Sequence, residues 1–346
     1  MIDLRTDTVT HPTEEMRDAM RRAELGDDGR DGDPTVRRLE EMAAAATGQE
    51  AGLMVPSGTM SNLVALLTHA NRDGGEVLLD ADSHIMRSEL GGIAKLAGLF
   101  PRIYPAERGT PDVAAVRDLI QPAMSRMKFP TSLVCMETTH NDAGGAVIPL
   151  EAIAAVKKVA TEKGIPVHID GARVFNAAVA LGVPASEIGK YADSIGFCVS
   201  KGLSAPVGSV LCGSRAFVDR ARVYRRMVGG TLRQAGVFAA AGIVALEKMV
   251  DRLADDHKRA RKLADGLHAI DPKLVNPNRV ATNIIMVEIG DTGMDAPPWV
   301  AALLKKGINT SVWNATSLRL VTHRHIDDAA LDQAISAFRE LHAAKH

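Results

Sequence analysis

Lys201 is the first residue whose surroundings indicate chemistry. An apolar run, Phe197 to Val199, leads into Ser200 and Lys201, and Gly202 then opens a turn. A lysine at the end of a buried strand, away from bulk water, can lose its proton and act as an amine nucleophile. A solvated lysine on a loop has the same local pattern, so this interpretation needs a second residue.

Asp170 is that second residue. It ends the apolar run Val167 to Ile169, and Gly171 follows it. A carboxylate at such a position can pair with a protonated heteroaromatic nitrogen, as an aspartate does with the pyridinium of pyridoxal phosphate; a helix cap or a salt bridge to Arg173 is the alternative. The 31 residues from Asp170 to Lys201 leave room for one helix and one strand between two strand ends. Together the two residues predict a pyridoxal-phosphate site.

Three further positions could complete this site. Ser57, Gly58 and Thr59 follow an apolar strand and precede a helix, where backbone N–H groups bind phosphate, although a plain helix cap looks the same. His84 follows another strand and could stack on a ring, move a proton or be a structural residue. Arg319 lies inside an apolar strand, and its burial is costly without an anion such as a bound carboxylate or a salt-bridge partner.

The elements around these residues predict the fold class. Short apolar strands alternate with helices, which is typical of βαβ units and a mostly parallel sheet. Ligands of such sheets bind outside the carboxyl ends of the strands, which is where the polar residues above lie. The predicted strands are 52–55, 76–79, 131–136, 167–169, 193–199, 208–212, 283–288 and 317–321, and the predicted helices are 34–46, 60–70, 88–97, 150–163, 238–270 and 329–344.

The composition argues against several other classes. The chain has 346 residues, a formal net charge of -1, and only 3% aromatic residues, which argues against a nucleic-acid partner. No stretch approaches the ~20 apolar residues that cross a bilayer, and charges near residue 1 argue against a secretory signal. Cys135, Cys198 and Cys212 lie in apolar runs, which favours reduced thiols and a cytoplasmic location. His140 and His168 lack ligand spacing to any cysteine, so no metal is predicted.

These residues, in this order, resemble the L-threonine aldolase family of fold-type-I pyridoxal-phosphate enzymes. The resemblance covers essentially the whole chain. The motifs that carry it are Asp3-Leu4-Arg5-Thr6-Asp7-Thr8-Val9-Thr10, Asp33-Pro34-Thr35, Pro56-Ser57-Gly58-Thr59-Met60-Ser61-Asn62, Glu137-Thr138-Thr139-His140-Asn141, His168-Ile169-Asp170-Gly171-Ala172-Arg173, Ser200-Lys201-Gly202-Leu203 and Arg319-Leu320-Val321-Thr322-His323.

The resemblance implies a role for each residue of the site. Lys201 would form a Schiff base with the cofactor, Asp170 would pair with the pyridine nitrogen, and His84 would stack on the ring and act as the base, directly or through a water. The cofactor-binding residues it implies are Ser57, Gly58, Thr59, His84, Asp170, Arg173, Ser200, Lys201 and Arg233, and the substrate-binding residues are Thr6, Arg30, Arg173 and Arg319. Arg233, and with it Arg226, would reach the site of a neighbouring subunit.

The resemblance also implies a fold and an assembly. The expected fold is α/β, of the fold-type-I pyridoxal-phosphate-dependent transferase kind. A large domain over residues 1–245 would hold a mostly parallel seven-stranded sheet flanked by helices, and a small C-terminal α/β domain would cover residues 246–346. The expected assembly is a homo-oligomer, a dimer or tetramer, with its active sites at the dimer interface.

The reaction implied by the resemblance is retro-aldol cleavage of a β-hydroxy-α-amino acid, such as L-threonine or L-allo-threonine, to glycine and an aldehyde. The alternatives are a β-eliminating lyase or a transaldolase on the same scaffold, and a binding protein without turnover. Two departures bear on the substrate. Family members commonly have an aromatic residue in the loop that here reads Gly29-Arg30-Asp31-Gly32, and often a histidine in the segment that here is residues 125–129. Arg30 or Arg87 could favour a polar or anionic β-group, which predicts a substrate other than threonine.

Overall fold

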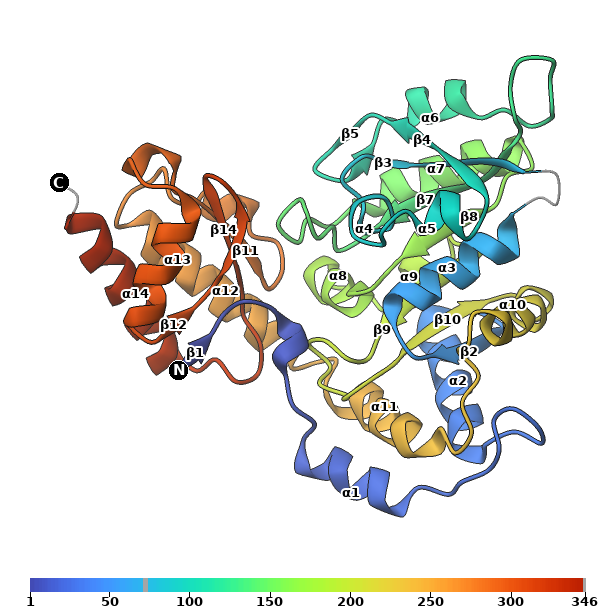
Figure 1. Ribbon diagram of the computed structural model, residues 1–346, viewed down its shortest axis with the longest axis horizontal. Coiled ribbons are helices and arrows are strands. Elements are labelled where there is room, and N and C mark those ends of the chain that lie inside the picture. The colour runs from blue at the N-terminus through green and yellow to red at the C-terminus, as the bar shows by residue number, and fades with distance from the viewer. Residues whose placement is uncertain (71–73, 345–346) are drawn as a thin grey trace.

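A seven-stranded sheet forms the centre of the larger of two lobes in this computed structural model, which describes residues 1–70 and 74–344 (Figure 1). The strand order is β2-β10-β9-β8-β7-β3-β4. The strands are β2 (Ala51–Val55), β3 (Gly75–Asp80), β4 (Leu99–Tyr104), β7 (Thr131–Glu137), β8 (Val167–Asp170), β9 (Ser194–Cys198) and β10 (Ser209–Gly213). Among these described strands β10 runs opposite to the rest: its pairs with β2 and β9 are antiparallel, and the pairs among β9, β8, β7, β3 and β4 are parallel. The predicted mostly parallel sheet is therefore confirmed.

Alternate residues of the strands pack against helices on opposite faces of this sheet, because successive side chains of a strand point to opposite sides. Leu78 belongs to one apolar core, while Val77 and Leu79 belong to another. The helices that cover the sheet are α2 (Pro34–Thr47), α3 (Gly58–His69), α6 (Val113–Leu119), α7 (Leu150–Glu162), α8 (Val174–Leu181), α10 (Arg215–Met227) and α11 (Gly236–Lys248). Every residue of β7, β8 and β9 is buried as a result.

The smaller lobe is built on a three-stranded antiparallel sheet with the order β11-β14-β13. Its elements are α12 (Leu253–His268), β11 (Ile284–Glu288), α13 (Ala296–Lys305), β12 (Ile308–Asn309), β13 (Ser311–Asn314), β14 (Ser317–Val321) and α14 (Asp328–Ala343). Strand β1 (Ile2–Asp3) pairs in parallel with β12, so the start of the chain joins this lobe. The predicted domain boundary between residues 245 and 246 falls inside α11, and the division itself stays a prediction.

Several segments differ from the predicted elements. Strand β4 and helices α6, α8, α10 and α13 were not predicted. Helix 88–97 is instead two short helices, α4 (His84–Arg87) and α5 (Gly92–Lys95), because Leu90 and Gly91 adopt positive φ angles of 52° and 77° between them. The predicted helix 238–270 is broken into α11 and α12. Helix α1 (Glu14–Arg22) was not predicted, because the segment around it is rich in polar residues and Met16 is its one fully buried residue.

The remaining short elements connect these larger ones. They are η1 (Asp7–Val9), β5 (Ala106–Glu107), β6 (Thr110–Pro111), α9 (Ser186–Gly189), η2 (Pro277–Arg279) and η3 (Gly290–Thr292). Among the residues described, none of the helices combines the length and the apolar character that a membrane crossing requires.

Candidate active site

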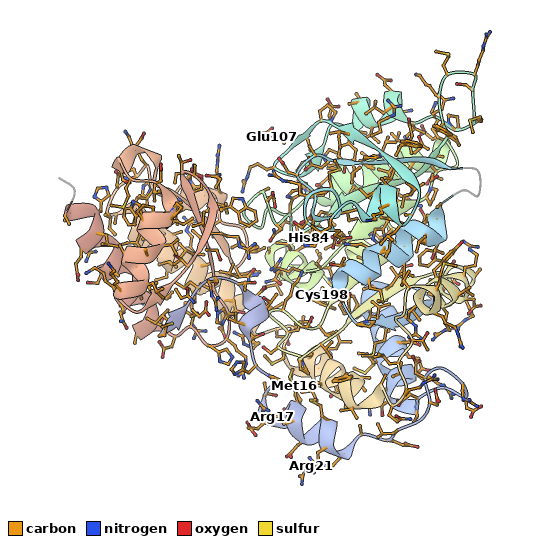
Figure 2. All side chains as sticks on the ribbon, viewed as in Figure 1. Met16, Arg17, Arg21, His84, Glu107 and Cys198 are labelled. Carbon is orange, nitrogen blue, oxygen red and sulfur yellow. The ribbon has the colours of Figure 1, made fainter. Side chains whose placement is uncertain are left out.

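Four neighbouring strands bring the predicted residues to one edge of the sheet. β9 leads to Lys201, β8 ends at Asp170, β7 ends at Glu137, and β3 leads to α4, which begins at His84. The parallel register pairs Glu137 with Asp170 and Asp170 with Gly196, so these carboxyl ends lie level. In Figure 2, His84 and Cys198 are seen near the middle of the view, on the side of the larger lobe nearer to the smaller one. The side chains needed for one site therefore converge as parallel-sheet topology predicts.

A buried hydrogen-bond chain joins Asp170 to His84. Asn62 Nδ2 donates to Asp170 Oδ2 at 2.8 Å and to Glu89 Oε1 at 2.7 Å. Glu89 Oε1 also lies 3.0 Å from His84 Nδ1. Burial raises the pKa of Glu89. In its ionised form this carboxylate only accepts, so His84 Nδ1 then carries a hydrogen and Nε2 is the nitrogen left to exchange a proton. The hydrogen bond to Glu89 raises the pKa of His84 above its usual value, although burial opposes this.

The side chains of His84, Glu89 and Asp170 are close enough together to be compared with a metal site. One ligand atom each from His84, Glu89 and Asp170 lies within 4.8 Å of the others. The hydrogen bonds from Asn62 and from His84 account for this spacing.

Burial, and then the charge of Asp170, raises the pKa of Glu137, whose oxygens accept the backbone N–H groups of His84 at 2.5 Å and Asn141 at 2.8 Å.

The amine of Lys201 makes no hydrogen bond or ion pair with any residue that the structure describes, while its backbone carbonyl accepts from Thr10 Oγ1 at 2.7 Å. Lys201, Arg173 and Cys198 border one small cavity. A Cβ placed on Gly58, the first residue of α3, would lie 2.8 Å from Cys198 Sγ. The first turn of α3 therefore lies near the strand end that carries the lysine. Ser57 Oγ accepts the Met60 N–H at 3.2 Å, which leaves the N–H groups of Gly58 and Thr59 for a ligand. Ser200 Oγ donates to the Gly208 carbonyl at 3.2 Å.

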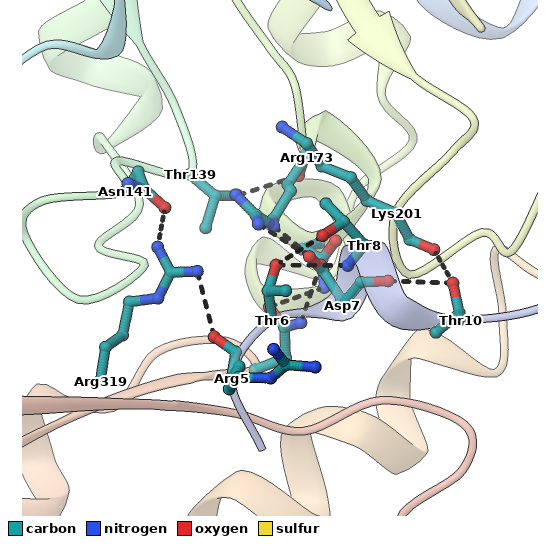
Figure 3. A network of polar contacts seen from close by, with 12 residues as sticks. Arg5, Thr6, Asp7, Thr8, Thr10, Thr139, Asn141, Arg173, Lys201 and Arg319 are labelled. Atoms are coloured by element: carbon teal, nitrogen blue, oxygen red, sulfur yellow. Dashed lines mark hydrogen bonds and ion pairs between the residues drawn. The ribbon is translucent and has the colours of Figure 1, made fainter. Parts of the chain in front are cut away.

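Figure 3 shows Lys201 within a polar network that also holds Thr6, Asp7, Arg173 and Arg319. Arg173 donates through Nε and Nη2 to the two oxygens of Asp7, each at 2.8 Å, and both side chains are buried. Burial alone would raise the pKa of Asp7, but the charge and hydrogen bonds of Arg173, with the charge of Lys201, hold it well below its usual range. Because this edge of Arg173 is engaged by Asp7, its predicted role at the substrate carboxylate is left to Nη1 and stays a prediction.

Arg319 is buried without a carboxylate partner among the described residues. Its Nη1 donates to Asn141 Oδ1 at 2.9 Å and its Nη2 to the Arg5 carbonyl at 3.3 Å, while Nε has no partner. Trp313 covers the guanidinium at 4.9 Å. Burial, and then repulsion from Arg173, lowers the pKa of Arg319 to about 10. A buried guanidinium in this state favours a bound carboxylate.

Two predicted residues are not joined to this network within one chain. Arg30 and Arg233 have side chains that are 78% and 65% exposed, and both face Asp27, at 3.9 Å and 3.5 Å. They lie by the loop between α1 and α2, which projects from the larger lobe in Figure 1. Thr6 caps η1 by accepting the Thr8 N–H at 3.3 Å. The role of Arg30 at the substrate and the role of Arg233 toward a neighbouring subunit stay predictions.

Sequence reasoning missed several polar residues around the site. Asp7, Asn62 and Asn141 stand inside the family-like motifs, so the motifs held the signal, but their partners are distant in the sequence. Glu89 lay in a segment predicted as a regular helix, where an acidic residue is ordinary. Its burial and its contact with His84 follow from the break at Leu90 and Gly91.

These groups fit pyridoxal phosphate. An unpaired amine at Lys201 suits its aldehyde, the buried carboxylate of Asp170 suits its ring nitrogen, and the first turn of α3 suits its phosphate. A mostly parallel sheet with this set of groups at its carboxyl edge defines a fold-type-I pyridoxal-phosphate enzyme.

Comparison with known proteins places the chain within that class. The family model described as beta-eliminating lyase matches residues 3–292, and the chain belongs to this family. The "Probable low-specificity L-threonine aldolase 2" of Arabidopsis thaliana is 44% identical, over 98% of this chain and 97% of that protein. The fold matches a structure of threonine aldolase from Leishmania major with a TM-score of 0.82 at 17% identity, covering 99% and 100% of the two chains. It also matches "SPT with PLP internal aldimine", with a TM-score of 0.77 at 18% identity, covering 99% and 88%.

Proposed function

We propose that this protein cleaves the Cα–Cβ bond of β-hydroxy-α-amino acids of the L-threonine and L-allo-threonine type, giving glycine and an aldehyde. The observation that carries the proposal is the buried Arg319, which lacks a carboxylate partner among the described residues. Figure 3 shows it in the same polar network as the backbone carbonyl of Lys201, whose amine makes no hydrogen bond with any described residue. Together they suit a substrate with both an α-carboxylate and an α-amine. The names of the similar proteins support the same reaction.

Each residue of the site would have a separate role in this reaction. When bound, pyridoxal phosphate supplies an aldehyde for an amine and a ring that takes up the electrons of a bond broken at Cα. Lys201 would hold it, Asp170 would keep its ring nitrogen protonated, and Arg319 would fix the substrate carboxylate and so orient the bonds around Cα. His84 Nε2 would take the proton of the β-hydroxyl group, since Nδ1–H is held by Glu89.

The products of the reaction test this proposal. The holoenzyme is incubated separately with L-threonine and L-allo-threonine, and glycine and acetaldehyde are measured against ammonia and 2-oxo acid. Glycine and acetaldehyde in equal amounts are expected, and Lys201→Ala should abolish them and prevent covalent trapping of the cofactor by borohydride. Ammonia with a 2-oxo acid would instead identify a β-eliminating lyase, the alternative that the family description keeps open.

We also propose that the protein is a homo-oligomer whose active site is completed by Arg233 of a neighbouring subunit. The support is the 65% exposure of the Arg233 side chain and its 3.5 Å pairing with Asp27. Mixing inactive Lys201→Ala protomers with inactive Arg233→Ala protomers should restore part of the activity; no recovery after subunit exchange would contradict the interface. Three free cysteines, all buried, support a reducing compartment, and the cytoplasm is the location proposed.

The preferred β-substituent is a separate part of the proposal. Arg87 pairs with Asp82 at 2.7 Å and with Asp142 at 3.5 Å, and Arg30 is largely exposed. Turnover of L-threonine, L-allo-threonine, phenylserine and 3-hydroxyaspartate should show a preference for a polar or anionic β-group if these arginines reach it. A clear preference for the threonine isomers would remove this idea while leaving the aldolase reaction intact.

A further inference from the structure

A second hydrogen-bond chain extends from Asn62 on the side away from Glu89. Asn62 Oδ1 lies 3.2 Å from His168 Nε2, and His168 Nδ1 lies 2.9 Å from Ser194 Oγ. Ser194 Oγ lies 2.8 Å from His69 Nε2. Asp170, Asn62, His168 and Ser194 are all buried, so this chain runs through the interior of the larger lobe.

The far end of this chain lies at the opposite edge of the sheet. His69 borders a large cavity that is also lined by Thr131, Pro166 and Asp193, which begin or directly precede β7, β8 and β9. Those are the amino ends of the strands whose carboxyl ends form the candidate active site. The chain of contacts therefore crosses the sheet from its outer edge to Asp170.

The positions of the hydrogens follow from the two carboxylates that Asn62 contacts. An ionised carboxylate only accepts, so Asn62 must turn its amide nitrogen to Asp170 and Glu89 and its oxygen to His168. That oxygen also accepts, so His168 Nε2 must carry a hydrogen. The orientation of one amide thus decides the tautomer of the histidine behind it.

The remaining hydrogen bonds of this series, from His168 to Ser194 and His69, have the same direction. Burial lowers the pKa of His168 to about 4, so the ring is neutral near pH 7 and its Nδ1 can only accept from the Ser194 hydroxyl. That hydroxyl, having donated its hydrogen, accepts from His69 Nε2. Burial lowers the pKa of His69 to about 3, so this ring is neutral as well.

We propose that His69, Ser194, His168 and Asn62 form a one-directional hydrogen-bond relay that positions Asp170 and stabilises its negative charge. Each donor is polarised by the donor behind it, which strengthens the final bond to the carboxylate. The relay acts through Asp170 and touches neither cofactor nor substrate, so its members are positioning residues. Only the benefit to catalysis rests on the proposed function; the direction of the hydrogens does not.

Neutron diffraction tests the direction itself. Holoenzyme crystals exchanged into D₂O near pH 7 should show deuterons on His69 Nε2 and His168 Nε2, and the Ser194 deuteron pointing to His168 Nδ1. A deuteron on His168 Nδ1, alone or together with one on Nε2, would overturn the relay. This result does not depend on which reaction the enzyme catalyses, so it separates failure of the relay from failure of the proposed function.

A pair of matched variants tests the effect on the active site. Ser194→Ala removes the central hydroxyl without touching Asp170, whereas Ser209→Ala removes a buried hydroxyl of β10 that donates to the Phe197 carbonyl at 2.5 Å and is no part of the relay. Ser194→Ala should lower kcat roughly 2- to 10-fold, the value of one hydrogen bond, with KM unchanged, and should shift the absorption maximum of the bound cofactor. Ser194→Thr keeps the hydroxyl and should restore both.

The comparison between these variants decides the proposal. If Ser194→Ala and Ser209→Ala give the same kcat and the same cofactor absorption as the unmodified enzyme, the relay does not act on Asp170. If both variants lower stability alike but only Ser194→Ala shifts the absorption maximum, the relay is supported, because a purely structural role would not separate them.

Discussion

His84 and Glu89 form the pair of residues on which proton transfer at the site depends. The hydrogen bond to Glu89 raises the pKa of His84 above its usual 6.5, and Glu89 fixes the hydrogen on Nδ1. A histidine acts as a general base only in its neutral, deprotonated form, so kcat/KM should fall as the pH drops through a midpoint above 6.5. Glu89→Gln removes the negative charge, lowers the pKa of His84 and should move this acid limb to lower pH.

The pH dependence of kcat/KM between pH 5 and pH 9 measures that shift. Asp82→Asn is the matched control, because Asp82 is exposed, pairs with Arg87 and does not contact the imidazole. An acid limb at the same pH in Glu89→Gln and in the unmodified enzyme would rule out His84 as the group that titrates.

Replacing Arg319 is expected to weaken substrate binding without lowering the stability of the fold. Its charge is buried without a carboxylate partner among the described residues and is repelled by Arg173. Arg319→Met should raise KM for L-threonine roughly 10- to 100-fold, the loss of a charged hydrogen-bonded contact, while the urea midpoint of unfolding stays the same or increases. Arg324→Met is the control, since Arg324 donates to the His11 carbonyl outside the network. An unchanged KM would remove Arg319 from the carboxylate site.

At the scale of elements, the approach of α3 to the end of β9 constrains the phosphate site. Gly58 has room for a hydrogen only, because a Cβ would lie 2.8 Å from Cys198 Sγ. Gly58→Ala should therefore weaken cofactor binding roughly 5- to 100-fold through overpacking, and adding Cys198→Ala should restore it. Cofactor affinity is measured by fluorescence titration of the apoenzyme. Gly92→Ala, where nothing lies within 4 Å of the added Cβ, is the control; a failure of Cys198→Ala to rescue would contradict the steric explanation.

The elements also show how far the sequence was informative. The strands that end at Asp170 and precede Lys201 were predicted within a residue or two, because fully buried parallel strands are continuous apolar runs with polar residues at their ends. From their placement the convergence of the two residues followed. The break between α4 and α5 was not predicted, although Gly91-Gly92 is a dipeptide typical of turns. The positive φ angle of Leu90 has no sign in its residue type.

The polar contacts of the site were the least predictable part. Asp7 and Arg173 are separated by 166 residues, and Asn62 and Asp170 by 108. Such pairs have no periodic pattern in the sequence, because each is defined only when two elements pack. The role of Asp7 and the relay behind Asn62 therefore needed the structure.

At the scale of the whole molecule, Asp7 connects the two lobes. It binds Arg173 of the larger lobe and accepts from Asn283, next to β11 of the smaller lobe, at 3.2 Å. Asp7→Asn leaves Arg173 buried without its counter-charge and should lower the free energy of unfolding by about 3–5 kcal/mol. Because the pKa of Asp7 is lowered in the folded state, the stabilisation by this carboxylate is present at neutral pH and is lost only in strong acid.

Urea unfolding of the holoenzyme measures this effect. Asp3→Asn is the control, because Asp3 pairs with Arg5 at the surface, with side chains 26% and 46% exposed, and should cost at most about 1 kcal/mol. Equal losses in the two variants would show that Asp7 does not link the lobes energetically.

The pairing of β1 with β12 has a consequence for the order of events on the ribosome. Ile2 is synthesised long before its partner Ile308, which is made only after the residues of the larger lobe. Strand β1 therefore has no partner strand while the central sheet folds. Asp7 lies a few residues after that strand, so we expect its contact with Arg173 to be fixed only after residues 308 and 309 have been made. A nascent chain stalled before residue 308 should hold a folded sheet but an open, protease-sensitive beginning.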